Sequence, residues 1–72
     1  MKCNITMPDG LKLKIQSQRR YVVAAYSPTR TRWEITRRSD NESTALAEWR
    51  ALGRRNDRPA HVVDTVEKKV IR

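Results

Sequence analysis

The stretch RYVVAAYSPTRTRWEITRRSDNESTALAEWRAL, residues 20–52, contains the change of sequence pattern that decides the fold. Its first residues are mostly β-branched or aromatic, which predicts a strand over Arg20–Tyr26. After a turn at Ser27–Arg30, apolar and polar residues alternate, and this period of two predicts a second strand over Thr31–Arg37. Two strands joined by so short a turn predict an antiparallel hairpin.

Beyond this hairpin the spacing of the apolar residues becomes helical. They recur at intervals of three or four residues, at Ala45, Leu46, Trp49 and Leu52. Ser39–Glu42 matches the capping box, in which a hydroxyl accepts a bond from the amide three residues on and the glutamate reaches back. Gly53 is a typical residue to end a helix. The sequence therefore predicts a helix over about residues 40–52.

Strands are also predicted on both sides of this central stretch. Lys2–Met7 and Leu11–Gln16 alternate in polarity around a Pro-Asp-Gly turn, which predicts an N-terminal hairpin. His61–Val66 is rich in β-branched residues and predicts a strand after the helix, and residues 70–71 predict a short final strand.

The expected fold belongs to the α+β class. It is a small antiparallel sheet of about four to five strands, in the order β-β-β-β-α-β, with one helix packed on one face. The 72 residues fit a single small domain. Residues 1–18 and 67–72 are candidates for a flexible N-terminal segment and a flexible C-terminal tail. Trp33 and Trp49 lie on the apolar sides of their elements, so we expect them to meet in the core.

Size and composition weigh against several classes of function. A core this small leaves no room for a deep cleft with a catalytic apparatus, and no catalytic residue, metal ligand or cofactor is predicted. The one histidine, His61, has no partner typical of a catalytic triad. Cys3, the only cysteine, excludes an internal disulfide or a cysteine zinc cage, and with the absence of a secretory leader it favours a reducing cytoplasm. The longest apolar run, Val22–Tyr26, is far shorter than the ~20 residues of a transmembrane helix.

Positive charge is the strongest signal for function. Sixteen Lys and Arg against eight Asp and Glu give a net charge of +8, of which +7 falls on residues 1–38 and +1 on residues 39–72. Such an excess predicts a polyanion or an acidic protein surface as partner. Arginine, which suits carboxylates and phosphates, outnumbers lysine by eleven to five. Lys12, Lys14 and Arg32 are expected on the exposed face of the sheet. The predicted partner-binding residues are Lys12, Lys14, Arg19, Arg20, Arg30, Arg32, Arg37, Arg38, Arg54, Arg55 and Arg58.

Ser39–Trp49, with the sequence SDNESTALAEW, resembles the helix of small phage proteins that bind and inhibit host RNA polymerase. The resemblance extends to the β-β-α-β order over about Arg20–Val66 and implies a regulator of transcription. In that family, arginines on the strand after the helix contact the polymerase. Thr65 and Glu67 stand at the matching positions here, so those contacts do not carry over. Basic phage regulators that bind near the RNA exit region and promote antitermination are similar in size and charge.

The order of elements also resembles sheet-type DNA readers, namely the AP2 domains of plants and the arm domains of phage integrases. Three strands precede the helix in those domains, but Arg37 and Arg38 stand where they carry a glycine-containing aromatic run. Three functions follow as hypotheses: a phage-type regulator of bacterial RNA polymerase that inhibits initiation or promotes antitermination, a duplex DNA-binding protein, and a phage inhibitor of another host system. Each implies a protein of the bacterial host cytoplasm, without membrane contact, that is a monomer or a weak dimer.

Overall fold

The computed structural model describes residues 2–55 and 58–72, with Arg55 described by its backbone alone. Six strands and one helix occur in this part of the chain, and they confirm the expected α+β class. In chain order they are β1 (Lys2–Thr6), β2 (Lys12–Gln16), β3 (Tyr21–Ser27), β4 (Arg32–Ser39), α1 (Glu42–Arg55), β5 (Ala60–Asp64) and β6 (Lys69–Val70).

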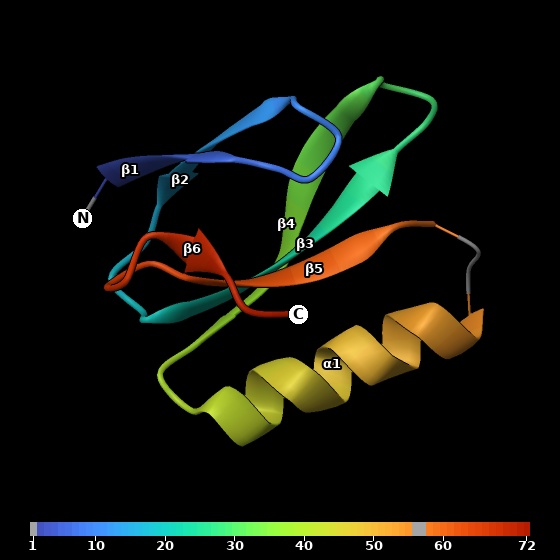
Figure 1. Cartoon of the computed structure of the whole chain (residues 1–72). Helices are drawn as coiled ribbons and strands as arrows, with labels where there is room; N and C mark the ends of the chain where they lie inside the picture. Colours follow the sequence, from blue (N-terminus) through green and yellow to red (C-terminus); the bar gives the residue numbers. More distant parts are fainter. Residues whose placement is uncertain (1, 56–57) are drawn as a thin grey trace.

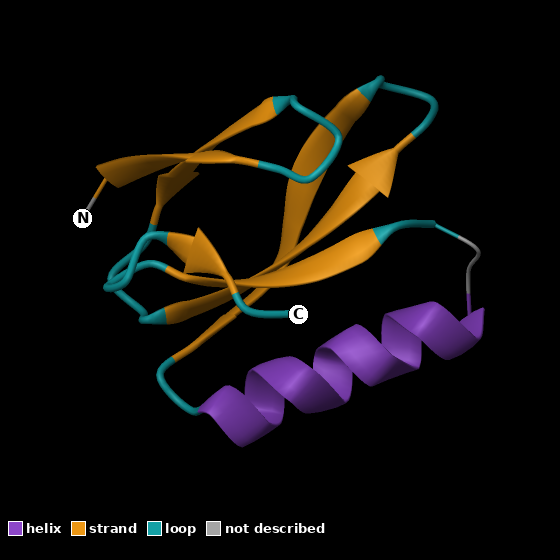
Figure 2. Ribbon diagram, in the orientation of Figure 1, coloured by secondary structure: helices purple, strands orange, loops and turns teal. Residues whose placement is uncertain are grey.

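The strands form two antiparallel sheets. Four of them pair in the order β4-β3-β5-β6, and β1 pairs with β2 alone. The β1–β2 hairpin packs on one face of the four-stranded sheet and α1 packs on the other, so the fold has three layers (Figure 1) (Figure 2). Residues 2–16, which lie within the candidate flexible segment 1–18, thus form a layer of the fold.

The central strand β3 explains why both faces of the sheet are covered. Val22, Val23 and Ala24 are fully buried although successive side chains of a strand point to opposite faces. Val23 packs beneath the helix together with Ala45, whereas Val22 and Ala24 pack against the hairpin. The unbroken apolar run of β3 is typical of a strand that is buried on both sides, and α1 alone covers only one of them.

The two tryptophans lie on opposite faces of the sheet, so the expectation that they meet is wrong. Trp33 pairs in register with Tyr26 and belongs to the core beneath the hairpin. Trp49 packs in the core beneath the helix. Each indole N–H has its own acceptor: Trp33 Nε1 donates to Asp9 Oδ2 at 3.1 Å, and Trp49 Nε1 donates to the Ala60 carbonyl at 2.8 Å.

Both ends of α1 differ from the sequence-based expectation. Asn41 is the N-cap, because its Oδ1 accepts from the Ser43 amide at 2.9 Å, whereas the Ser39 hydroxyl accepts from the Asn41 amide at 3.0 Å. The predicted capping box between Ser39 and Glu42 is therefore wrong. At the other end the helix continues through Gly53 to Arg55, so Gly53 does not end it.

Candidate anion-binding surfaces

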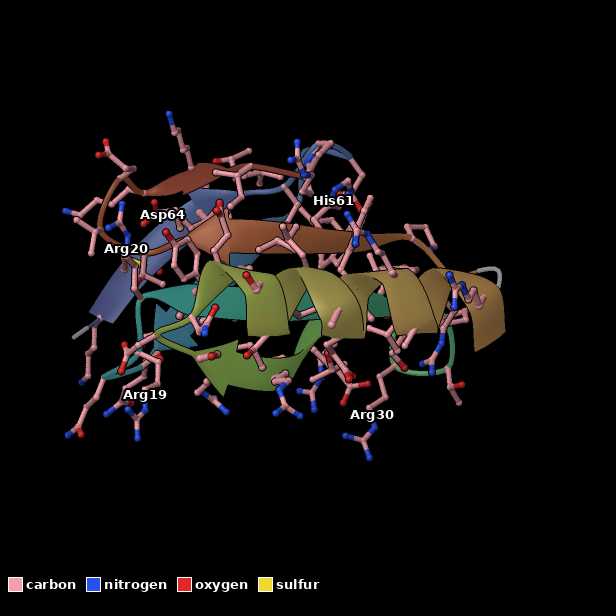
Figure 3. All side chains as sticks on the ribbon, turned by 90° about the horizontal axis from the view of Figure 1, so that it is seen from below. Arg19, Arg20, Arg30, His61 and Asp64 are labelled. Atoms are coloured by element: carbon pink, nitrogen blue, oxygen red, sulfur yellow. The ribbon has the colours of Figure 1, made fainter. Side chains whose placement is uncertain are left out.

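Three of the arginines predicted to bind a partner form ion pairs within the chain. Arg19 pairs with Asp40 at 2.7 Å, Arg20 with Asp64 at 2.9 Å and Arg30 with Glu34 at 3.3 Å. Arg19 and Arg30 lie at opposite ends of the sheet, and Arg20 and Asp64 lie side by side (Figure 3). These three arginines therefore do not form one continuous surface.

The Arg20–Asp64 pair is a structural contact. The guanidinium binds the carboxylate through Nε and a terminal nitrogen, and the same carboxylate accepts from the amides of Val66 and Glu67. The hydrogen bonds from Arg20, followed by those from the two amides, hold the pKa of the buried Asp64 below its ordinary value. The Thr65 hydroxyl also donates to the Arg20 carbonyl at 2.7 Å. This network holds the start of β3 against the turn after β5. The turn begins where β5 ends, at Asp64.

The Arg19–Asp40 pair is exposed on both sides and contributes less. Arg19 and the Arg20 amide both donate to Asp40, and these bonds, that of Arg19 first, lower the pKa of its carboxyl group. Surface pairs of this kind add little stability. Asp40 thus connects two segments some twenty residues apart, and it is not free to cap α1.

A continuous basic and polar surface occurs on the solvent side of the β1–β2 hairpin, which we call the outer face. The inward side chains Ile5, Leu13 and Ile15 are buried in the core, so the alternating residues point to solvent. All of them are exposed, and the register pairs Lys2 with Gln16, Asn4 with Lys14 and Thr6 with Lys12. The outer face therefore has three lysines, three neutral polar side chains and no carboxylate.

Sequence reasoning found Lys12 and Lys14 but missed the rest of the outer face. The alternation in Lys2–Met7 puts Lys2, Asn4 and Thr6 on the polar side of their strand, and Gln16 follows the same pattern in the next strand. The signal for this surface is the polar side of each of the two strands. Only the strand register shows which residues of β1 stand opposite which residues of β2.

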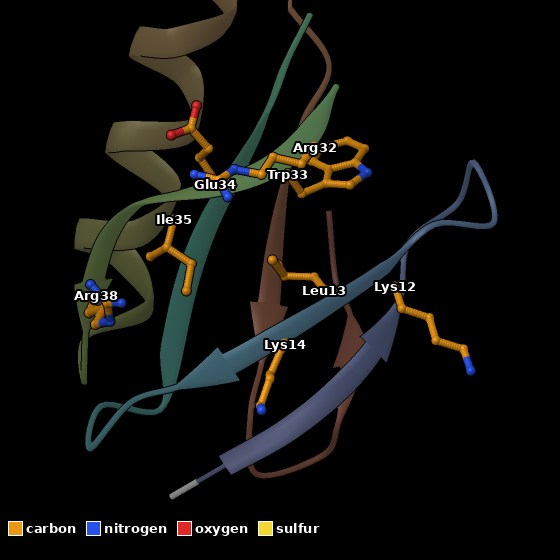
Figure 4. Close-up of a pocket in the computed structure, with 8 residues that line it drawn as sticks. All are labelled: Lys12, Leu13, Lys14, Arg32, Trp33, Glu34, Ile35 and Arg38. Carbon is orange, nitrogen blue, oxygen red and sulfur yellow. The ribbon is translucent and has the colours of Figure 1, made fainter. Parts of the chain in front are cut away.

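A second basic surface is the groove between β2 and β4, with a volume of about 450 Å³. Leu13, Trp33 and Ile35 form its apolar lining, and Figure 4 shows Leu13 and Ile35 in the space between the two strands. The charged lining residues are Lys12, Lys14, Arg32, Arg38 and Glu34. The expectation that Lys12, Lys14 and Arg32 share the exposed face of one sheet is wrong, because β2 belongs to a separate hairpin that covers a face of the sheet containing Arg32. The same residues instead come together along this groove.

The remaining predicted residues lie elsewhere. Arg37 is exposed on the helix side of β4, because its register partner Val23 faces the helix. Arg54 and Arg58 line a hollow of about 400 Å³ beside Trp49, together with Arg50, which sequence reasoning missed. The side chain of Arg55 lies outside the described part of the chain.

Within residues 2–55 and 58–72, no group of three or more His, Cys, Asp or Glu side chains is placed to hold a metal ion. The described helix is neither long enough nor apolar enough to cross a membrane. Comparison of the chain with protein-family models, with curated proteins and with solved structures gives no match. The candidate surfaces are therefore the basis for any assignment of function.

Proposed function

We propose that this chain is a small DNA-binding protein of the bacterial cytoplasm that contacts the duplex with the outer face of the β1–β2 hairpin. The observation that carries this proposal is the composition of the outer face, three lysines and three neutral hydrogen-bonding residues without a carboxylate. A two-stranded ribbon fits the major groove of B-DNA, which is about 12 Å wide. Five residues of strand extend roughly 16 Å, enough to follow several base pairs.

The two kinds of side chain on the outer face suit two kinds of contact. Lys2, Lys12 and Lys14 can neutralise phosphates and release counterions, which supplies affinity without sequence preference. Asn4 and Gln16 can pair with the edge of adenine in the major groove, and Thr6 can contact a thymine methyl group. The net charge of +8 adds long-range attraction to any duplex.

Titration of a labelled duplex of about 20 base pairs against the protein, over a series of salt concentrations, tests this proposal. The double variant Lys12→Ala, Lys14→Ala should weaken binding and reduce the slope of log affinity against log salt by about 1.8, because two phosphate contacts are lost. The matched control is Arg50→Ala, Arg54→Ala, which removes the same charge from the helix layer. Equal effects of the two double variants would contradict binding by the outer face.

Binding to bacterial RNA polymerase is a second candidate function, and the groove between β2 and β4 favours it. A basic rim over an apolar lining suits an acidic protein surface better than a phosphate backbone. The residues that resemble the phage polymerase inhibitors serve the fold of this chain, since Asn41 caps α1 and Ala45 and Trp49 pack in the core. The resemblance thus reflects residues that cap and pack the helix. Inhibition of initiation, antitermination and action on another host system stay predictions.

Recovery of partners from a bacterial lysate, with and without nuclease, separates the two candidates. Polymerase subunits that are retained after nuclease treatment would support direct binding to the enzyme. Their loss after the treatment, together with saturable binding of bare duplex at about 0.15 M salt, would leave DNA as the partner.

A further inference from the structure

We propose that the free edge of β4 accepts an extended acidic segment of a partner protein as an additional strand. This inference goes beyond DNA binding and concerns the edge of β4, whose groove shares Lys12 and Lys14 with the outer face. In the described part of the chain, β4 pairs with β3 and with no other strand. The backbone groups along its other edge are therefore open to a strand from another chain.

The two faces of β4 define which segment fits. Trp33 and Ile35 point toward the hairpin and, with Leu13, line the groove, so every second side chain of an added strand would meet an apolar surface. Arg32, Glu34 and Arg37 lie on the opposite face, because Arg32 and Glu34 alternate with Trp33 and Ile35 and the register partner of Arg37, Val23, packs beneath the helix. Arg30 pairs with Glu34, so positive charge prevails on this face, and alternating apolar and acidic residues match the edge.

The charges around this edge favour an acidic occupant. Arg32, Arg37 and Arg38 form no ion pair with any described residue, and the carboxylate among the groove residues, Glu34, is bound by Arg30 at 3.3 Å. A second copy of this chain is disfavoured on the same grounds, since each copy has a net charge of +8. The positive charge thus disfavours pairing between the β4 edges of two copies and favours an acidic segment.

A bulge fixes where the added strand would pair. The register of β3 with β4 shifts between Val23 and Ala24, and Thr36 is left without a partner. A bulge bends its strand and breaks the ladder locally. The regular part of the edge is therefore Arg32–Ile35, beside the apolar lining of the groove, and Arg38 lies beyond the bulge, where it can bind a carboxylate at the end of the segment.

Two labelled peptides test strand addition separately from charge attraction. The first alternates Val and Glu over about ten residues, and the second has the same sequence with every second backbone nitrogen methylated, so that the donors on one edge are lost. Fluorescence anisotropy at about 0.15 M salt should show binding of the first peptide and at least about tenfold weaker binding of the second. Hydrogen exchange of the amides of Arg32–Ile35 should slow only with the first peptide. Equal binding of both peptides would overturn the proposal.

Charge reversal on the protein locates the site. Arg38→Glu, or Arg38→Gln if the first variant does not fold, should weaken binding of the Val–Glu peptide about tenfold relative to Arg54→Glu, which makes the same change on α1. An equal loss in the two would show attraction by net charge alone. Slower exchange at Arg32–Ile35 on raising the protein concentration, or on adding duplex DNA without peptide, would assign the edge to a second copy or to DNA. Either of these results would overturn the proposal.

Discussion

Asp9, at the tip of the β1–β2 hairpin, binds two parts of the fold at once. Its Oδ1 accepts from the Leu11 amide at 2.9 Å, which closes the turn, and its Oδ2 accepts from Trp33 Nε1 at 3.1 Å. The second bond fastens the hairpin to β4. Because the outer face and the β2 wall of the groove both lie on this hairpin, Asp9 positions the two candidate surfaces without taking part in either.

Substitution of Asp9 tests this role. Asp9→Ala should lower the free energy of unfolding by about 1–2 kcal/mol, because the partly buried indole N–H loses its acceptor and the turn loses its bond. Asp9→Asn keeps one acceptor oxygen and should lie between wild type and Asp9→Ala. Urea unfolding followed by tryptophan fluorescence measures both. An Asp9→Ala variant as stable as the wild type would show that apolar packing alone holds the hairpin.

Asp64 makes the stability depend on acid. Its pKa is lower in the folded protein than its ordinary value of 3.8, chiefly because Arg20 donates to it. A group of this kind stabilises the fold fully above its unfolded pKa, and the contribution is lost as the pH falls through the lowered folded pKa. The pKa of Asp40 is shifted in the same direction, with Arg19 as the first cause. We therefore expect stability to be flat near neutrality and to decrease below about pH 4.

The variant Asp64→Asn isolates this effect. At pH 7 it should unfold at lower urea concentration, with a loss of about 2 kcal/mol, because the ion pair with Arg20 is lost and one acceptor oxygen is replaced by an NH2 group that faces other donors. Its stability should also change less than that of the wild type between pH 5 and pH 2, a range chosen from the usual pKa of Asp. Urea titrations over this range measure both quantities. Parallel pH profiles of the two proteins would show that other carboxylates cause the acid sensitivity.

At the scale of elements, features that depend on neighbouring residues were predicted better than features that depend on contacts between distant segments. The alternation in Leu11–Gln16 and the helical spacing of Ala45, Leu46, Trp49 and Leu52 depend only on neighbours in the sequence, and the corresponding elements occur. The sequence could not show that the hairpin forms its own sheet and layer, because the packing of β2 across β3 depends on contacts between distant segments. The same holds for the candidate site. The exposure of Lys12 and Lys14 followed from alternation, whereas the ion pair of Arg20 with Asp64 joins residues that are 44 positions apart in the sequence.

The end of α1 was also decided by more than its local sequence. Gly53 lies inside the helix, and a Cβ placed on it would have no heavy atom within 4 Å. Gly53→Ala should therefore stabilise the protein by about 0.5–1 kcal/mol, because alanine restricts the unfolded chain and favours the helix. For a domain of this size the melting temperature should rise by about 2–8 °C.

A second glycine supplies the control for this prediction. Gly10 has a φ of +91°, a conformation that side chains rarely adopt, so Gly10→Ala should lower the melting temperature although space is open there too. Thermal unfolding followed by circular dichroism measures both variants. A decrease for Gly53→Ala would show that the last turn of α1 needs the freedom of glycine after all.

At the scale of the whole molecule, the charge is divided among surfaces with different roles. Arg20 stabilises the fold, and the exposed Arg19 and Arg30 sit in weak surface pairs. The lysines of the outer face and the arginines of the β4 edge form two adjoining surfaces, which share Lys12 and Lys14. The +8 net charge therefore does not describe one patch. Two candidate contact surfaces hold part of this charge, and their occupants would compete.

This sharing predicts that DNA and an acidic strand exclude each other. A saturating amount of the Val–Glu peptide should weaken binding of the labelled duplex, because the peptide neutralises Lys12 and Lys14 and brings its own negative charge beside the outer face. Since linkage is reciprocal, the duplex should weaken binding of the peptide by the same factor. The N-methylated peptide, equal in charge, should compete much less when added at the same concentration. Anisotropy titrations with either partner labelled measure both factors, and a ternary complex with unchanged affinities would show that the two surfaces act independently.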